Sequence, residues 1–264
     1  SKGVEISADM YPYAYWQSTM QVLFPERNFN DRVEAEFVLS QITTPAGITL
    51  TQFDPNPDYV GKTLQQISRI RKEDPPATLL ALIEQTLDKD DSESIIAESM
   101  TEDDVIDLIK WKYTNICTDG GSGGGHPRGY GTYPRILGKY VRENGWLSLE
   151  EAVYKMSGLA AKNMGLKGRG MLKVGNVADI VIFDPETIID KATPQNSTEI
   201  SIGIETVIVN GSPVFSNKTT TRYRPGKFLN GPGYNVDQFS DELTAYFNTH
   251  VKADEPGVAL MVRK

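Results

Sequence analysis

The chain has 264 residues, of which 39% are hydrophobic and 23% charged, a composition typical of soluble globular proteins rather than disordered ones. Its single cysteine excludes an internal disulfide framework and a cysteine-rich zinc site. The net charge of -8 argues against nucleic-acid binding, and the apolar runs are far shorter than the roughly 20 residues of a membrane-spanning helix. We therefore expect a soluble protein without nucleic-acid or membrane partners, whether cytoplasmic, periplasmic or secreted.

The N-terminal residues predict a strand that runs into a loop. Residues 4–10 alternate apolar and polar side chains and are followed by Pro12. Before them, Ser1 is not an initiator methionine, and no basic and apolar signal sequence is present. We expect the chain to begin inside a longer protein.

From about residue 28 to residue 112 the pattern favours helices with polar connections. Pro75 opens one apolar helix, and Thr101 with Asp104 resembles a capping box at the start of another. Residues 84–104 are strongly acidic, which fits the solvated surface of loops and helices better than an acidic docking face.

A second strand is predicted at residues 113–118, and it ends at Asp119 and the glycine-rich residues 120–125. In an α/β barrel the active site forms at the carboxyl ends of the strands. A carboxylate there could take a proton from an attacking water and return it to the leaving amine, although Asp before Gly is more often only a turn residue. The glycines could let a ligand approach or form a flap, and no Gly-Lys-Ser or Gly-Lys-Thr follows to indicate nucleotide binding.

The C-terminal half predicts two helices and then a small β unit. One helix covers about residues 133–143 and stops at Asn144 and Gly145, and the next begins at Ser148. Strand patterns follow at residues 177–183 and around a hairpin signal, Asn-Gly at positions 210 and 211. Beyond residue 226 the sequence is linker-like, with a further helix at residues 239–247.

Few side chains in this sequence could hold a metal. The two histidines, His126 and His250, lie in different segments, and neither a His-x-His nor a Glu-x-x-His pair occurs. The chain alone is therefore not expected to assemble a zinc site. Arg128 could pair in bidentate fashion with a substrate carboxylate, although a structural arginine fits the residue alone equally well.

Several segments resemble, in sequence and in order, the D-aminoacylase (N-acyl-D-amino-acid deacylase) branch of the amidohydrolase superfamily. Residues 8–13 are Ala-Asp-Met-Tyr-Pro-Tyr, residues 118–120 are Thr-Asp-Gly, and residues 126–138 are His-Pro-Arg-Gly-Tyr-Gly-Thr-Tyr-Pro-Arg-Ile-Leu-Gly. The resemblance spans roughly residues 4–228 and is loose between residues 28 and 112.

The resemblance implies an α/β fold that is the C-terminal part of an amidohydrolase (β/α)8 barrel, a TIM barrel. Residues 1–157 would supply this barrel part, with a helical subdomain inserted at residues 28–112, and residues 158–228 would form part of a small β-sandwich. Residues 229–264 would be a linker and the start of a second domain, because residues 255–264 resemble the opening of serine hydrolases related to β-lactamases. Open barrel edges would require self-association or pairing with a missing N-terminal half.

The resemblance also implies roles for individual residues. Asp119 would be both a zinc ligand and the catalytic acid and base, and Arg128 would bind the substrate α-carboxylate. Tyr11 and Ser18 would help to position that substrate, and His126 is included because it belongs to the same motif, with no step assigned. The other zinc ligands would lie outside this chain.

The activity implied is hydrolysis of the amide of an N-acyl-D-amino acid to a carboxylate and a free D-amino acid. Two alternatives stay open: a non-catalytic fragment or interaction module, and an amidohydrolase acting on a cyclic amide or a dipeptide. Arg128 distinguishes the cyclic-amide or dipeptide alternative from the deacylase, because a substrate without a free carboxylate gains nothing from a guanidinium.

Overall fold

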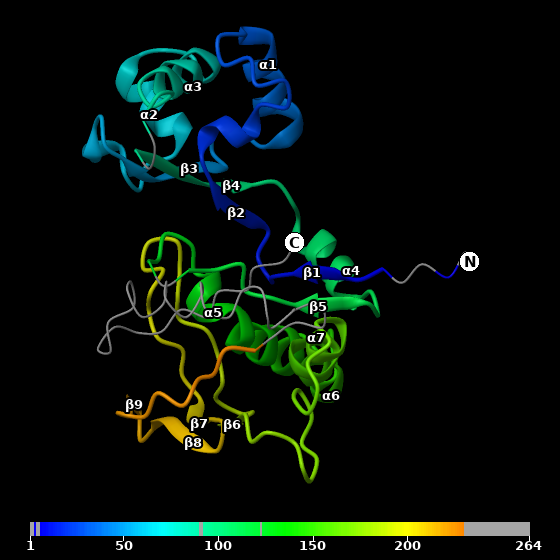
Figure 1. The fold of residues 1–264 in the computed structure, drawn as a ribbon. Coiled ribbons are helices and arrows are strands. Elements are labelled where there is room, and N and C mark those ends of the chain that lie inside the picture. The colour runs from blue at the N-terminus through cyan, green and yellow to red at the C-terminus, as the bar shows by residue number, and fades with distance from the viewer. Residues whose placement is uncertain (1–2, 4–5, 90–91, 122, 230–264) are drawn as a thin grey trace, which may run out of the picture. The chain divides into compact units, whose positions relative to one another are not determined.

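The computed structural model describes residues 3, 6–89, 92–121 and 123–229 (Figure 1). The chain forms two compact units, one of Ser1–Leu149 with Ile188–Ile202 and one of Glu150–Thr187 with Gly203–Lys264. No helix in the described stretches has both the length and the apolar composition needed to cross a membrane. The domain boundaries expected from the sequence remain predictions, and the helix at residues 239–247 and the segment 255–264 lie outside the described residues.

Two short parallel strands set the edge at which the candidate site forms. Strand β1 (Ala8–Met10) pairs with β5 (Thr114–Ile116), and helix α4 (Glu102–Lys110) packs against both. Because the strands are parallel, their carboxyl ends meet at one edge, where Tyr11 and Asp119 follow. Both strands confirm the predicted ones, and the described residues show them as a two-stranded sheet rather than as a closed barrel.

The inserted subdomain contains a sheet that the sequence did not reveal. Strands β2 (Tyr15–Ser18), β4 (Glu93–Glu98) and β3 (Ile48–Phe53) form an antiparallel sheet with β4 in the centre. Figure 1 shows the helices of the subdomain gathered on one side of this sheet. These elements are η1 (Met20–Leu23), α1 (Arg32–Phe37), η2 (Val38–Ile42), η3 (Pro57–Tyr59), α2 (Leu64–Arg71) and α3 (Pro75–Glu84). The expectation of a purely helical insertion was therefore wrong, although its helices at Pro75 and Thr101 are confirmed.

A buried apolar core holds the subdomain together. It includes Met20, Leu23, Phe24, Ala35, Val38, Ile48, Leu50, Phe53, Leu64, Ile67, Leu79, Leu82, Ile83, Ile95 and Ala97. The core draws on η1, α1, η2, α2 and α3 and on strands β3 and β4, so burial of apolar area stabilises the subdomain as one unit.

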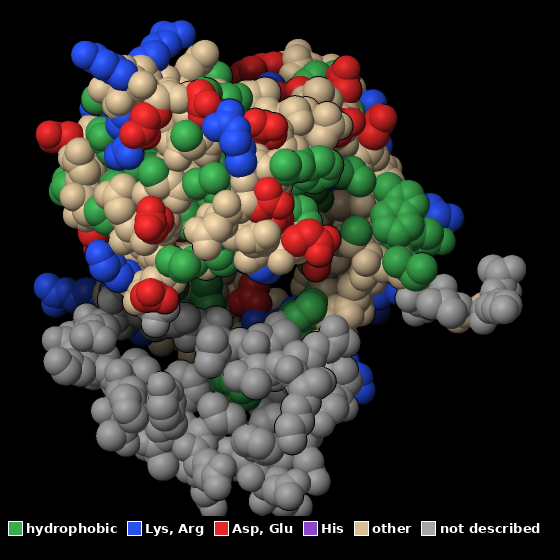
Figure 2. Space-filling model, turned by 90° about the horizontal axis from the view of Figure 1, so that it is seen from above, with side chains coloured by type: hydrophobic (Ala, Val, Ile, Leu, Met, Phe, Trp, Pro, Cys, Tyr) green, Lys and Arg blue, Asp and Glu red, His purple; other side chains and the backbone are tan. Residues whose placement is uncertain are grey.

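Part of the acidic stretch is buried rather than solvated. Glu93 in β4 is 5% exposed, its Oε1 accepts a hydrogen bond from the Met20 backbone N–H at 2.8 Å, and its Oε2 has no hydrogen-bond partner. Burial raises the pKa of Glu93 from 4.5 to about 7. The expectation of a solvated surface was therefore wrong for β4. On the face shown in Figure 2, acidic and basic side chains are interspersed.

Replacing Glu93 with Gln should stabilise the protein above neutral pH. Because the pKa of Glu93 is higher in the folded state than in the unfolded state, its contribution to stability is fully present below pH 4.5 and is lost as the pH rises through 7. Urea unfolding should show Glu93→Gln more stable than the wild type at pH 8, by up to about 3 kcal/mol, and the difference should vanish near pH 4.5. The exposed Glu98 at the end of the same strand supplies the control, Glu98→Gln. Equal pH dependence in both variants would contradict this account.

The long helix of the first unit begins earlier than predicted. Helix α5 (Arg128–Arg135) continues without a break into the π-helix η4 (Ile136–Glu143), and the chain turns at Gly145, which has a φ of +61°. The predicted helix and its end are thereby confirmed. Residues 188–202 pack against it so closely that a Cβ on Gly138 would lie 2.5 Å from the carbonyl oxygen of Ile188.

The second unit contains a helical stretch and one antiparallel sheet. Its helices are α6 (Leu149–Val153), η5 (Tyr154–Gly158) and α7 (Leu159–Asn163), and its strands, in sheet order, are β6 (Ile180–Phe183), β7 (Ile204–Val209), β8 (Ser212–Ser216) and β9 (Thr219–Thr220). Asn210 and Gly211 have φ of +46° and +79°, as a two-residue hairpin turn requires, so the predicted hairpin is confirmed. The described residues of this unit form a single sheet, and the sandwich remains a prediction.

Candidate active site

A backbone contact between two glycines brings the end of β5 to the start of α5. A Cβ on Gly120 would lie 2.5 Å from the Cα of Gly129, and a Cβ on Gly129 would lie 2.7 Å from the carbonyl oxygen of Gly121. Only glycine allows backbones to approach this closely. The neighbours of these glycines, Asp119 and Arg128, are thereby held next to each other, with Asp119 in the left-handed region at a φ of +43°.

Arg128 lies at the centre of the group that results. Its Nη2 is 3.1 Å from Oδ2 of Asp119, and its Nη1 donates to the hydroxyl of Tyr11 at 3.1 Å. The guanidinium also lies over the Tyr11 ring, 4.9 Å from the centroid. The Arg128 side chain is only 12% exposed, whereas that of Asp119 is 65% exposed. The carboxylate therefore faces solvent, where a substrate would arrive, and the guanidinium lies behind it.

Tyr11 is held in its neutral form. Burial raises its pKa, and the positive charge of Arg128 opposes this effect only in part. Because Arg128 donates to the phenol oxygen, the Tyr11 O–H remains able to donate to a substrate oxygen.

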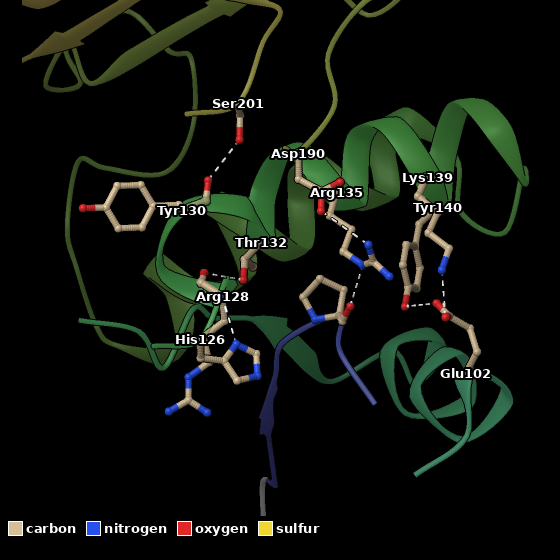
Figure 3. A network of polar contacts seen from close by, with 11 residues as sticks. Glu102, His126, Arg128, Tyr130, Thr132, Arg135, Lys139, Tyr140, Asp190 and Ser201 are labelled. Carbon is tan, nitrogen blue, oxygen red and sulfur yellow. Dashed lines mark hydrogen bonds and ion pairs between the residues drawn. The ribbon is translucent and has the colours of Figure 1, made fainter. Parts of the chain in front are cut away.

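His126 is buried beside this group, with an exposed fraction of 3%. Its Nδ1 accepts a hydrogen bond from the backbone N–H of Arg128 at 3.0 Å (Figure 3), and its Nε2 lies 2.9 Å from the carbonyl oxygen of Tyr15. Burial lowers the pKa of His126 from 6.5 to about 4, so the ring is neutral at physiological pH. Arg128, Tyr11 and His126 thus form one cluster, as the sequence motifs suggested.

Ser18 is not part of this cluster in the described contacts. It pairs with Ile95 at the end of β2, and its side chain makes no hydrogen bond with Tyr11, Asp119 or Arg128. The preceding residue, Gln17, lies instead against Gly125 of the glycine-rich loop and donates to Ser94 at 3.1 Å. Sequence reasoning missed Gln17. Because side chains alternate along a strand, Gln17 and Ser18 face opposite sides of β2.

Further along the same helix, three side chains hold α5 and η4 in place (Figure 3). Arg135 donates to the carbonyl oxygen of Pro12 at 2.9 Å and pairs with Asp190. Lys139 and Tyr140 both contact the carboxylate of Glu102, each at 2.7 Å. These contacts were not predicted, because they join segments that are distant in the sequence.

Comparison with known proteins identifies relatives of this chain. The model of the amidohydrolase family (Amidohydro_3) matches residues 118–215. An N-acyl-D-glutamate deacylase of Alcaligenes xylosoxydans xylosoxydans is 34% identical over 229 residues, covering 86% of this chain and 42% of that protein. A D-aminoacylase of the same organism is 45% identical over 132 residues, which are 49% of this chain and 27% of the relative.

Solved structures of deacylases also match this chain. The N-acyl-D-glutamate deacylase of Bordetella bronchiseptica, complexed with zinc and a phosphonate inhibitor, matches with a TM-score of 0.65 and 31% identity, over 83% of this chain and 41% of that one. A D-aminoacylase structure matches with a TM-score of 0.67 and 32% identity, over 84% of this chain and 42% of that one. The chain is related to the D-aminoacylase branch of the amidohydrolases. It spans less than half the length of the curated relatives that it matches.

The described residues contain no complete set of metal ligands. Among those residues, no group of three or more His, Cys, Asp or Glu side chains is placed to bind an ion. Asp119 offers one exposed carboxylate, whereas zinc in proteins takes three or four ligands. Cys117 is a half-buried thiol whose pKa is raised by burial.

Substituting Gly120 with Ala should disrupt the D-aminoacylase-like site, whereas the same change at Gly121 should not. The added methyl at position 120 meets backbone at 2.5 Å, so Gly120→Ala should lower the free energy of unfolding by about 1–3 kcal/mol. A Cβ on Gly121 meets nothing within 4 Å, and any entropic effect on the unfolded chain is common to both variants. Denaturant unfolding of the two variants tests this. Equal stability would show that the glycine contact does not constrain the site.

Proposed function

We propose that this chain contributes the carboxylate-binding and proton-transfer part of an enzyme that hydrolyses N-acyl-D-amino acids to a carboxylate and a free D-amino acid. The observation that supports this most is the placement of Arg128 between Tyr11 and Asp119. The curated relatives that are deacylases point to the same class of substrate.

Arg128 and Tyr11 would recognise the free carboxylate of the substrate. A guanidinium presents planar N–H donors that match a carboxylate, and charge-assisted hydrogen bonds of this kind are among the stronger ones in proteins. Nη1 and Nη2 of Arg128 each carry two N–H groups and are bonded to Tyr11 and Asp119 respectively, so each nitrogen has a further N–H that could donate to a carboxylate. The neutral Tyr11 hydroxyl can add one further donor.

Asp119 would carry out the proton transfers. Its carboxylate is exposed at the end of β5, so it can accept the proton of the attacking water and then deliver it to the leaving nitrogen. Arg128 at 3.1 Å would fix the orientation of the carboxylate during both steps. Ser18 stays a proposed positioning residue, with less support than Tyr11.

We propose zinc as the cofactor, with Asp119 as one ligand and the other ligands from polypeptide outside the described residues. A bound zinc would supply Lewis acidity at the acyl carbonyl. One carboxylate is too few for a complete site, so this proposal requires further polypeptide to complete the fold. Pairing with such an N-terminal part, or self-association, would also cover the open edges of β1 and β5.

A cyclic-amide substrate has weaker support. A dihydroorotase of Endomicrobium trichonymphae is 43% identical, but over only 56 residues, or 21% of this chain. The observation that fits a non-catalytic role is that the described residues contain no group of three or more metal-ligating side chains.

In the complete deacylase proposed here, Arg128→Ala should raise KM for N-acetyl-D-amino acids by about 100-fold or more, because the substrate carboxylate loses its charged partner. For the corresponding N-acetyl-D-amino acid amide, which has no free carboxylate, KM should change little, and any fall in kcat from the lost contact between Arg128 and Asp119 should be similar for both substrates. Asp119→Asn should instead lower kcat by at least about 100-fold, because the proton acceptor is lost. Steady-state kinetics on both substrates separate these effects.

Arg32 provides the control, because it forms exposed ion pairs with Glu36 and Asp74 in the inserted subdomain. Arg32→Ala should leave both kinetic constants unchanged. If Arg128→Ala raised KM for the acid and the amide substrates equally, carboxylate recognition would be wrong. Faster turnover of the L-enantiomers than of the D-enantiomers by the wild type would overturn the proposed substrate class.

A further inference from the structure

We propose that His126 is a positioning residue for Arg128 and Tyr11, and that it contacts neither the substrate nor a metal. This inference rests on the proposed function of Arg128 as the carboxylate-binding residue. It gives His126 an indirect role, where the sequence resemblance placed this residue in the motif without assigning it a step.

The hydrogen bonds of His126 leave neither ring nitrogen free. Because Nδ1 accepts from the Arg128 N–H, the ring proton lies on Nε2, which donates to the Tyr15 carbonyl oxygen. A metal ligand needs an unprotonated nitrogen with no other partner, and a proton shuttle needs access to the reacting atoms. With 3% of its surface exposed, His126 meets neither requirement.

His126 also replaces a missing helix cap. Arg128 is the first residue of α5, and its N–H is one of the donors that a helix leaves without an internal partner. The N-cap residue is Pro127, whose side chain makes no capping hydrogen bond. Nδ1 of His126 satisfies the N–H of Arg128 instead and so fixes the backbone from which the guanidinium extends.

The ring packing connects His126 to the second carboxylate-binding residue. The imidazole meets the Tyr11 ring edge-on, with centroids 5.8 Å apart, and it lies 5.2 Å from Tyr13 and 4.8 Å from Tyr15. Aromatic pairs at these separations favour such geometries. His126 therefore contacts Tyr11 through its ring and Arg128 through its backbone, and it joins both to β2 of the inserted subdomain. Burial, together with the charge of Arg128, keeps the pKa near 4 and the ring neutral.

Two substitutions test this role. Asn at position 126 can place an amide oxygen near the position of Nδ1 and keep the bond from the Arg128 N–H, whereas Phe keeps the ring but has no acceptor. In the 264-residue chain, amide hydrogen exchange by NMR should show the Arg128 N–H exchanging about tenfold or more faster in His126→Phe, and within about threefold of the wild type in His126→Asn. The amides of β4 report whether either variant has lost its fold.

Kinetics of the complete enzyme provide the second readout. His126→Phe should raise KM for N-acetyl-D-amino acids by about tenfold with kcat changed less than about threefold, and His126→Asn should recover most of the KM. Unchanged exchange of the Arg128 N–H in His126→Phe would overturn the inference, as would loss of bound zinc in His126→Asn. If exchange behaves as expected but the wild type shows no deacylase activity, the positioning role stands and the proposed function fails.

Discussion

The candidate site depends on the close approach of Gly120 to Gly129. This contact leaves no room for a side chain on either residue, and it fixes the distance between the end of β5 and the start of α5. Asp119 and Arg128 flank the two glycines, so the backbone contact holds their side chains within reach of each other for the 3.1 Å ion pair. Once the guanidinium is fixed, Tyr11 at the end of the neighbouring parallel strand lies within its reach.

The inserted subdomain contacts the candidate site through strand β2. The Tyr15 carbonyl oxygen in β2 bonds to His126, and Gln17 of the same strand lies against Gly125. On the other side of the loop, the N–H of Gly125 donates to Ser197 at 2.8 Å. The glycine-rich loop is thus bounded by β2 and by residues 188–202.

Features that depend on neighbouring residues could be predicted from the sequence. The ends of the strand before Asp119, of the helix at Asn144 and of the hairpin at Asn210 were found because local turn chemistry determines them. Strand β4 was missed because its acidic composition resembles a solvated surface, and its partners Ser18 and Leu50 are far away in the chain. The proximity of Asp119 and Arg128 followed from the family resemblance. The positioning role of His126 could not be predicted from the resemblance, because Tyr15 is 111 residues away in the sequence and only the folded chain shows their contact.

The central claim is that the chain itself holds the Arg128 guanidinium in place before any substrate binds. Nitrogen NMR of the arginine side chains measures this directly, with the Arg128 resonances assigned by their loss in Arg128→Lys. We predict slow rotation about the Cζ–Nε bond and slow hydrogen exchange at Nη1 and Nη2 in the ligand-free chain, because these atoms are bonded to Tyr11 and Asp119. Resonances that match those of a freely rotating, solvent-exposed arginine would contradict the account.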